Sequence, residues 1–454
     1  MSAVDDEIQL LESELSAAQP EIRRLDDYYE GEQPLKYMAP AMVKEVGDTI
    51  SQLVINWAQV VADAHEHRLD IEGFRYSGND SEVAELRQVW QGNNLDEQSQ
   101  QGHLDAIALQ RAYICVGAGD SPDDLPIVTI ESPMQVITRR DPRTRKVKSG
   151  WKTWAEDDKV GTRRGVLYLP DSTRLMTFGR DGWAQDGPAD DHMMGRVAMV
   201  PLVNRPRIMR QGGSSEFKQV IGLADAANKM ATDMMISGEY HAMPRRWIFG
   251  LSEKDFVDEK TGQRKSVFSM IKSHIWATEK SGSEVSAGQF QESDLRNFHE
   301  TIKLLAALTS HLSGLPSDYM SFTSDNPSSA DAIRASESRL IKRVERMQTY
   351  LGGSWEEAMR IALFHITGEF APEADLLETQ WRDPSTPTLA AKADAISKLA
   401  SGANPIMPKE MAREELGWSE AKRELARKYE QDAMRSSAQA LSDGFNGNLD
   451  DAAA

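Results

Sequence analysis

Residues 314–340 read GLPSDYMSFTSDNPSSADAIRASESRL, and this stretch determines how the rest of the chain is interpreted. Its Gly-Leu-Pro start is typical of a helix end, because glycine suits the C-terminal cap and proline cannot continue a helix. Ser328 and Asp331 have capping-box spacing, with Asp in place of Glu or Gln, so a new helix is expected from Ser328. The stretch predicts two helices that present a polar loop at their common tip, and such loops often have a function.

The segments on both sides of this loop have the apolar spacing of helices. After the loop, a helix is expected from 328 to 367 with a bend at Gly352-Gly353. Its spacing is set by Ile333, Leu340, Val344, Met347 and Leu351. Before the loop, residues 293–313 are expected to form a helix whose apolar face contains Leu295, Phe298, Ile302, Leu305 and Leu312.

A further helix is expected from residue 214, and its apolar stripe consists mostly of small residues. The stripe contains Phe217, Val220, Ala224, Ala227, Ala231, Met234 and Gly238. Small side chains let two helix backbones approach closely, so the stripe predicts tight packing against a neighbouring helix. Between the two helices, residues 244–292 are expected to contain short strands at RRWIFG, VFSMI and HIWAT.

The N-terminal half mixes helices with a β-rich segment, so the predicted fold class is α+β and mainly α. The expected elements are a helix over 4–30 interrupted near Pro20, a largely helical 41–67, a strand over 69–75, and helices over 81–91 and 95–112. Residues 113–204 contain short β-rich runs separated by Gly, Pro and Asp turns. The clearest hairpin there spans 134–155.

Composition excludes several classes of protein. The 454 residues exceed a single typical domain, and a hydrophobic fraction of 40% is ample for a core. A net charge of −19 argues against tight, sequence-independent binding of nucleic acid. The single cysteine, Cys115, lies in an apolar run and is expected to be buried, which fits a reducing compartment. The sequence predicts neither a signal peptide nor a membrane span.

Strong catalytic signatures are absent from the sequence, so the chain is not expected to be an enzyme or to need a cofactor or metal. The nearest candidate for a metal site is His65-Glu66-His67. Residues at i and i+2 of a helix do not face each other, so a solvated helix end is the preferred interpretation. A metal-dependent hydrolase remains an alternative. A basic cluster lies on the 134–155 hairpin and could contact DNA or an acidic partner, but a solvated hairpin tip is the preferred interpretation. The cluster comprises Arg139, Arg140, Arg143, Arg145, Lys146 and Lys148.

The order of these elements, together with the sequences that form them, resembles the portal protein family of tailed double-stranded DNA bacteriophages. These proteins are the head-to-tail connectors of the siphophage type. The resemblance is found in several stretches that span most of the chain in order. They are LDDYYEGEQPLKYMAP (25–40), LVINWAQVVADAHEHRLDIEGFR (53–75), IGLADAANKMATDMMISGEYHAMPRRWIFG (221–250), LTSHLSGLPSDYM (308–320), NPSSADAIRASESRL (326–340) and QWRDPSTPTLAAKADAISKLASG (380–402).

The resemblance implies a dodecameric ring around an axial channel, built from regions called wing, stem, clip and crown. The expected regions are 1–213 wing, 214–243 stem helix, 244–292 clip, 293–313 stem helix, 314–327 tunnel loop, 328–379 bent helix and wing return, 380–430 crown, and 431–454 disordered tail. The small-residue stripe is then expected to pack against the stem helix of the adjacent subunit.

The resemblance also implies a function in DNA packaging and ejection at one vertex of the virion, after assembly in the host cytoplasm. The expected partners are double-stranded DNA without sequence specificity, the terminase large subunit, the head-to-tail adaptor, the major capsid protein and the scaffold, with no membrane. The clip residues expected to contact terminase or adaptor are Lys254, Lys260, Arg264 and Lys265. Another ring-forming head component is the alternative within phage proteins.

The DNA-facing residues implied by the resemblance lie in the tunnel loop. They are Ser317, Asp318, Tyr319, Met320, Ser321, Phe322, Thr323, Ser324, Asp325 and Asn326. An uncharged or acidic loop is expected to guide DNA without gripping it, because conduction requires binding weak enough to release. Tyr319 and Phe322 have a second interpretation as packing anchors between loops, and the sequence leaves both open.

Overall fold

The computed structural model of the chain describes residues 3–436 with internal gaps, and it divides into two compact units, 1–384 and 385–454. The gaps are 35, 37–52, 78–82, 120, 122–123, 157–162, 181, 242–245, 250–285, 290–294, 321–329, 386–388, 402–404 and 419–421. For 239–294, 321–334 and 386–391 at most the backbone is described.

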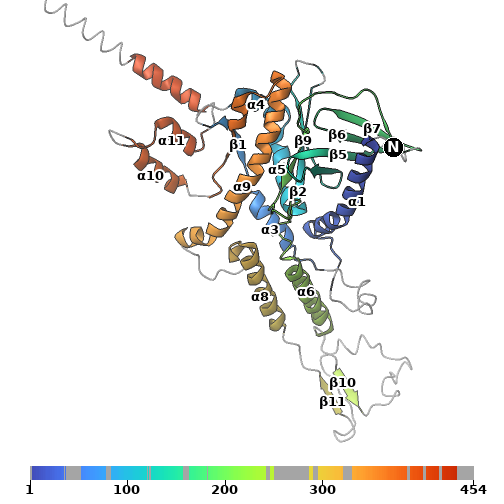
Figure 1. The fold of residues 1–454 in the computed structure, drawn as a ribbon. Helices are drawn as coiled ribbons and strands as arrows, with labels where there is room; N and C mark the ends of the chain where they lie inside the picture. Colours follow the sequence, from blue (N-terminus) through green and yellow to red (C-terminus); the bar gives the residue numbers. More distant parts are fainter. Residues whose placement is uncertain are drawn as a thin grey trace, which may run out of the picture. The chain divides into compact units, whose positions relative to one another are not determined.

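The first unit is an α+β body, as predicted (Figure 1). Its described helices are α1 (Ala3–Glu30), α3 (Trp57–Glu66), α4 (Ala84–Gly92), α5 (Leu95–Leu109), α6 (Ile221–His241), α8 (Arg296–Ser313) and α9 (Ala330–Thr367), with short 3-10 turns η2 (Ser317–Tyr319) and η3 (Pro372–Leu376). Its strands are β1 (Ile71–Tyr76), β2 (Arg111–Gly117), β3 (Ile127–Glu131), β4 (Val136–Arg140), β5 (Val147–Ala155), β6 (Arg163–Tyr168), β7 (Thr173–Gly179), β8 (Gly182–Gln185), β9 (Met199–Val203), β10 (Arg246–Phe249), β11 (Ser286–Gln289) and β12 (Leu377–Trp381).

Two antiparallel sheets form the centre of the body. The three-stranded sheet has the order β3-β2-β9, and the five-stranded sheet has the order β4-β5-β6-β7-β8. The predicted hairpin is confirmed as β4–β5, with Arg140 paired to Val147 across the turn. Cys115 of β2 is buried as expected, and burial raises the pKa of its thiol to about 12.

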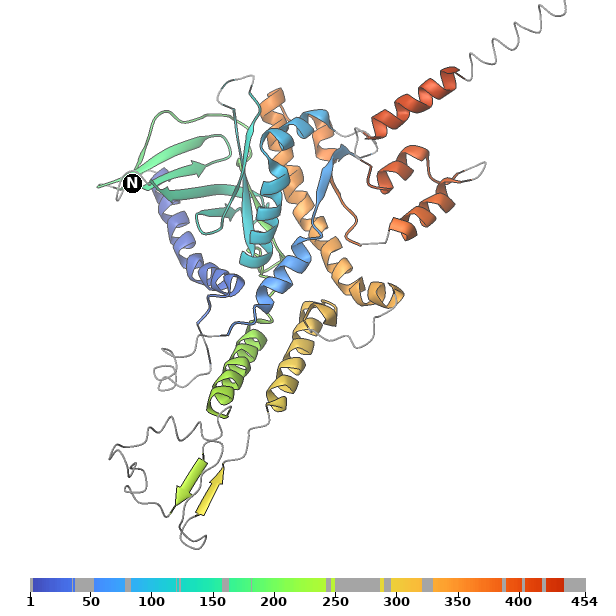
Figure 2. The same ribbon diagram turned by 180° about the vertical axis from the view of Figure 1, so that it is seen from behind.

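The main core lies between the three-stranded sheet and helices α3, α4, α5 and α9. At its centre the indole Nε1 of Trp355 donates a hydrogen bond to Nε2 of His103 over 2.9 Å, and both side chains are fully buried. His103 is therefore a core residue whose Nε2 has the partner that a buried polar atom needs. Figure 2 shows α5 and α3 from the side opposite to Figure 1.

Two helices are continuous at positions where the sequence suggested an irregularity. The interruption expected near Pro20 is wrong. Helix α1 continues through Pro20, because Leu15 and Ile22 on either side of it are buried against the body and hold both halves in place. Helix α9 continues through Gly352-Gly353. A Cβ at Gly352 would lie 3.1 Å from Nε1 of Trp381, so this glycine permits a close approach of β12.

Helices α6 and α8 lie side by side in both views of the chain (Figures 1 and 2). β10 and β11 pair antiparallel, with Arg246 opposite Gln289, which confirms the strand expected at RRWIFG. The strands expected at VFSMI and HIWAT lie outside the described residues.

The second unit contains α10 (Leu389–Ala400), α11 (Lys409–Glu415) and a helix over 422–436. Arg413 joins α11 to the last helix, since its guanidinium donates to both Glu410 and Glu430 over 2.6 Å. The expectation of disorder from residue 431 is wrong for 431–436, which are helical. The boundary expected after residue 379 falls inside β12, and the two compact units separate after Pro384.

Candidate functional site

The loop between α8 and α9 begins with a tightly built helix end. Gly314 takes a positive φ of 75° and its N–H donates to the carbonyl of Ser310 over 2.9 Å. The left-handed conformation suits glycine, which has no Cβ. A Cβ at this position would also lie 3.2 Å from the guanidinium of Arg343, so a larger residue would strain the backbone and crowd this side chain.

The first residues of the loop return to the body. The hydroxyl of Ser310 donates to the carbonyl of Leu315 over 2.7 Å, and Leu315 is buried in the main core. Ser317–Tyr319 form the 3-10 turn η2, and Met320 after it is again buried in that core. Two buried apolar side chains therefore anchor the start of the loop.

Arg343 of α9 holds the end of α8. Its guanidinium donates to the carbonyls of Ser313 and Leu312, the latter over 3.0 Å. The last carbonyls of a helix lack partners within the helix and form the negative end of its dipole, so a cation is well placed there. The same guanidinium also donates to Oε1 of Glu216 over 3.0 Å.

Glu216 is a buried carboxylate that connects three elements. Besides Arg343, its Oε1 lies 3.6 Å from a guanidinium nitrogen of Arg205 and 3.8 Å from Nε2 of His65. The Glu216 side chain is 1% exposed. A charge buried to this degree requires such partners, so Glu216 fixes Arg343 in place for the contact with α8.

His65 corrects an expectation from the sequence. It was interpreted as part of a solvated helix end, yet its ring is fully buried and Nδ1 donates to the carbonyl of Val61 over 2.7 Å. Burial lowers the pKa of His65, although the nearby Glu216 opposes this effect. His67 is by contrast 72% exposed, so the two rings do not converge. Within the described residues, no cluster of His, Cys, Asp or Glu is suited to hold a metal ion.

Arg68 joins the start of the loop to the start of α9. Its Nη2 donates to the hydroxyl of Tyr319 over 3.2 Å and to Oε1 of Glu337 over 2.8 Å. Its Nη1 donates to the carbonyl of Pro384 over 2.8 Å. Tyr319 is therefore held by the body of its own chain, while 39% of its surface remains exposed.

The structure describes only part of the candidate loop. Ser317, Asp318, Tyr319 and Met320 are described, and of these only Met320 is buried. Residues 321–326 lie outside the described residues, as do Lys254, Lys260, Arg264 and Lys265.

Sequence reasoning missed the residues that mount the loop, namely Arg68, Glu216 and Arg343. One signal was present for Arg343, which lies between Leu340 and Val344 in a helix whose inward face includes both. A guanidinium beside two core positions predicts a partner on the body. No comparable pattern marks Glu216, because its partners come from α3, α9 and the loop after β9.

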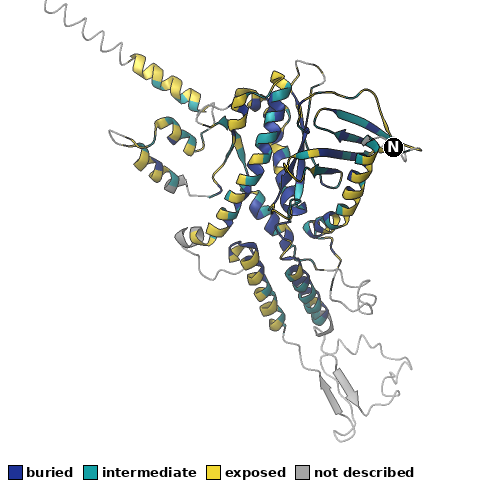
Figure 3. Cartoon of the chain, viewed as in Figure 1, coloured by how far each residue is buried: buried dark blue, intermediate teal, exposed yellow. Residues whose placement is uncertain are grey.

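Helices α6 and α8 differ in which apolar residues they bury (Figure 3). On α6 the small residues Ala224, Ala227 and Ala231 are buried within the chain, so the expectation that the stripe faces an adjacent subunit is wrong for these residues. On α8 an i, i+4 ridge of Leu304, Leu308 and Leu312 is exposed by 60%, 43% and 40%. Leu312 therefore does not belong to the buried face of α8, contrary to expectation.

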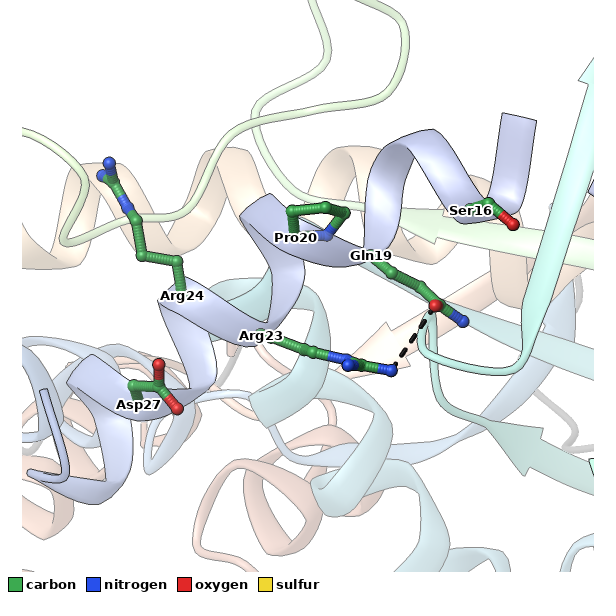
Figure 4. A pocket seen from close by; sticks show the side chains of 6 residues that line it. All are labelled: Ser16, Gln19, Pro20, Arg23, Arg24 and Asp27. Atoms are coloured by element: carbon green, nitrogen blue, oxygen red, sulfur yellow. Dashed lines mark hydrogen bonds between the residues drawn. The ribbon is translucent and has the colours of Figure 1, made fainter. Parts of the chain in front are cut away.

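The surface recess on α1 offers no catalytic set. It is lined by Ser16, Gln19, Pro20, Arg23, Arg24 and Asp27, and Figure 4 shows Arg23 donating to Oε1 of Gln19 over 3.5 Å. These side chains include a single carboxylate and no histidine or cysteine, so they match no known arrangement for hydrolysis. No described helix is long and apolar enough to cross a membrane.

Comparison with known proteins gives consistent matches over the chain. A family model described as "Phage portal protein, SPP1 Gp6-like" matches residues 9–438. The portal proteins of Mycobacterium phages D29 and L5 are each 34% identical, over 441 and 445 residues. The alignments cover 95% of this chain and 87% and 90% of those proteins.

Solved structures give more distant matches. A chain from the neck of a native gene transfer agent particle, computed with C12 symmetry, is 14% identical at a TM-score of 0.46. A chain from the neck of the empty particle, computed with C6 symmetry, is 13% identical at a TM-score of 0.48. Each alignment covers 84% of this chain and 95% of the other. These structural likenesses are too distant to support a functional argument.

Proposed function

This chain belongs to the SPP1 Gp6-like family of phage portal proteins, and we propose that it forms a dodecameric ring around an axial channel for double-stranded DNA. Family membership confirms the resemblance expected from the sequence and excludes the alternatives of a hydrolase and of a different head component. A portal protein is a structural component of the virion and not an enzyme.

The exposed leucine ridge of α8 is the observation that best supports ring formation. Leu304, Leu308 and Leu312 form a continuous apolar row on one side of the helix. Burying such a half-exposed side chain contributes on the order of 1 kcal/mol. The described part of the chain leaves this ridge open, so an adjacent copy could cover it, and a repeated contact of this kind closes into a ring.

The mounting of the loop supports its proposed position at the channel. Arg343 holds the end of α8 before the loop, and Arg68 holds Tyr319 at the start of the loop and Glu337 on α9 beyond it. Leu315 and Met320 anchor the start of the loop in the main core. Tyr319 is held by Arg68, so we assign it to positioning the loop. The residues that face DNA in this proposal are therefore Ser321–Asn326, which carry one carboxylate and no cation. Such a surface guides DNA without binding its phosphates.

The proposal includes the partners that a portal ring needs. Residues 244–292 form the clip, which meets the terminase large subunit during packaging and the head-to-tail adaptor afterwards, with Lys254, Lys260, Arg264 and Lys265 as contact residues. The major capsid protein and scaffold surround the ring at one vertex, and the ring assembles in the host cytoplasm before it enters the virion.

A loop deletion tests this function. Particles are assembled with a chain that lacks residues 321–326 and, as the control, with a chain in which Gly and Ser replace these residues at equal length. We expect both variants to form rings, because the anchors at Leu315 and Met320 are retained. The deletion is expected to lose nuclease-protected DNA inside the particle. Normal packaging by the deletion variant would show that this loop does not serve the channel.

A further inference from the structure

Two basic segments far apart in sequence line one cleft of the body. The first is the tip of the β4–β5 hairpin, which contributes Arg140 and Arg145. The second is the loop after β9, which contributes Pro206, Arg207, Ile208 and Gln211. The cleft has a volume of about 370 Å³.

The arginines of this basic cleft are available to a partner. Arg145 and Arg207 are exposed and form no ion pair with any carboxylate that the structure describes. Nor does Arg210, which lies beside the cleft. In a chain of net charge −19, a group of cations without such partners on one surface forms an electrostatically distinct face.

An apolar tip stands beside these cations. Ile208 and Met209 are 73% and 91% exposed. The turn that carries them is closed by reciprocal backbone hydrogen bonds, from the N–H of Arg207 to the carbonyl of Arg210 over 3.1 Å and in the opposite direction over 2.9 Å. Arginine with exposed methionine is the composition of a protein interface, whereas DNA phosphates would leave the apolar tip uncovered.

The same chain also carries a cluster of acidic residues, whose charge is opposite to that of the basic cleft. It comprises Asp26, Asp27, Glu30 and Glu32 at the end of α1, Asp63 and Glu66 on α3, and Asp105 on α5. Burial, together with the charges of Asp27 and Glu32, raises the pKa of Asp26. Burial and the neighbouring Asp26 likewise raise the pKa of Asp105 to about 6. These carboxylates repel one another and lack cationic partners among the described residues, apart from the exposed His67 beside Glu66.

The cleft and the cluster are on opposite sides of the three-stranded sheet. Pro201 and Val203 of β9 line the cleft, whereas Leu202 between them points to α5, where a Cβ on Gly102 would lie 3.4 Å from it. Successive side chains of a strand point to opposite faces, so α5 covers the face away from the cleft. Helices α1 and α3, which carry the rest of the acidic cluster, pack against α5.

We propose that the basic cleft of one copy binds the acidic cluster of the adjacent copy of this chain, which rests on the ring proposed above. In a head-to-tail ring each copy presents one face to the next copy's opposite face. Charges of opposite sign on these faces attract the correct surfaces and disfavour pairing of like surfaces. The apolar tip of Ile208 and Met209 is buried in the same contact.

A charge-exchange experiment tests this pairing by native mass at physiological salt, about 150 mM. The variant R145E/R207E is expected to raise the concentration needed for ring assembly by about tenfold or more. The variant D27K/E30K is expected to do the same. The control R180E/K303E reverses two exposed cations of the same unit that do not line the cleft, and it should assemble as the natural chain does. Combining R145E/R207E with D27K/E30K restores the net charge of −19 and should restore assembly.

The assembly of these variants distinguishes the pairing of cleft and cluster from the formation of a ring as such. If the natural chain never forms rings, the proposed function fails, and the pairing fails with it. If the natural chain forms rings and R145E/R207E assembles equally well, only the pairing is overturned. Normal assembly of R145E/R207E with weakened DNA binding would assign the cleft to DNA and would also overturn the pairing. Failure of the combined variant to recover while both parent variants fold would contradict a direct contact between the two surfaces.

Discussion

Helices α6 and α8 pack side by side, yet α6 buries its apolar stripe within the chain and α8 leaves an apolar ridge exposed. On α6 the small residues Ala227 and Ala231 are 0% and 1% exposed, so its apolar stripe is already covered within the chain. On α8 the ridge that includes Leu304 and Leu308 is open. The stripe of α6 stabilises the single chain, whereas the ridge of α8 is left open and is covered by an adjacent copy in the ring that we propose.

The junction between the two helices and the body explains how both are held. Glu216 lies just before α6, and through Arg343 it positions the end of α8. Substitutions at this junction, on α6 and on α8 test the contrast between the two helices. The quantity compared is the free energy of unfolding of the single chain, measured by urea denaturation where the chain is monomeric.

Replacing Glu216 by Gln should lower the free energy of unfolding by about 3 kcal/mol, because breaking one partner of a buried ion pair is costly. Glu345→Gln is the matched control, since its partner Lys342 is 69% exposed. A surface pair of this kind contributes about 0–1 kcal/mol. Equal effects of the two substitutions would mean that Glu216 does not secure the junction.

Replacing Ala227 by Leu should lower the free energy of unfolding by about 2 kcal/mol, because the buried position has no space for a larger side chain. Gly222→Ala on the same helix is the control. A Cβ there meets nothing within 4 Å, so this substitution should be neutral or stabilise by up to about 1 kcal/mol. If leucine is tolerated in place of Ala227, the stripe of α6 is open to a neighbour after all.

Acid should weaken the junction through His65. Burial lowers the pKa of this imidazole below its usual value of 6.5. Below about pH 6.5 the unfolded chain therefore binds a proton that the folded chain does not. Stability from this group should be present at neutral pH and fall, as the pH drops below that point, by up to about 1.4 kcal/mol per pH unit. The variant His65→Gln should show a shallower loss in urea denaturation across this range, and an unchanged slope would refute the assignment.

Replacing Leu308 by Ser should change the free energy of unfolding least, by about 0.5 kcal/mol, since the side chain is exposed in the single chain. The same substitution should strongly weaken ring assembly, seen as a shift of native mass toward the monomer. Lys303→Ser on the same helix should leave assembly unchanged, because Lys303 is also exposed but lies outside the ridge. Rings of normal stability from the Leu308 variant would remove the contrast between α6 and α8.

The sequence predicts where helices lie better than what they face. Apolar spacing correctly located α8 and the hairpin β4–β5, because local periodicity follows backbone geometry. It also located α6, but the helix expected from residue 214 begins at Ile221, and 214–220 are not helical. It assigned the stripe of α6 to an adjacent subunit, since spacing alone does not tell an internal neighbour from an external one. The close approach of Trp381 to Gly352 was not predicted either, because Trp381 belongs to a strand that follows later in the chain.

The candidate site shows a similar division. The polar loop after Gly314 was predicted from its helix stop and cap, which are local signals. Its supports were not predicted, because Arg68, Glu216 and Arg343 come from three distant segments and meet only in the folded body. The buried His65 was likewise misjudged, since the carboxylate near it belongs to residue 216.

The native mass of the purified chain shows whether it forms the proposed ring. Light scattering is measured on the natural chain, with negative-stain images of the same sample and with scaffold and capsid protein added in a second series. Closed rings of about twelve copies of the 50.6 kDa chain with a central hole are expected. A monomer in both series, with no rings at any concentration, would contradict ring formation.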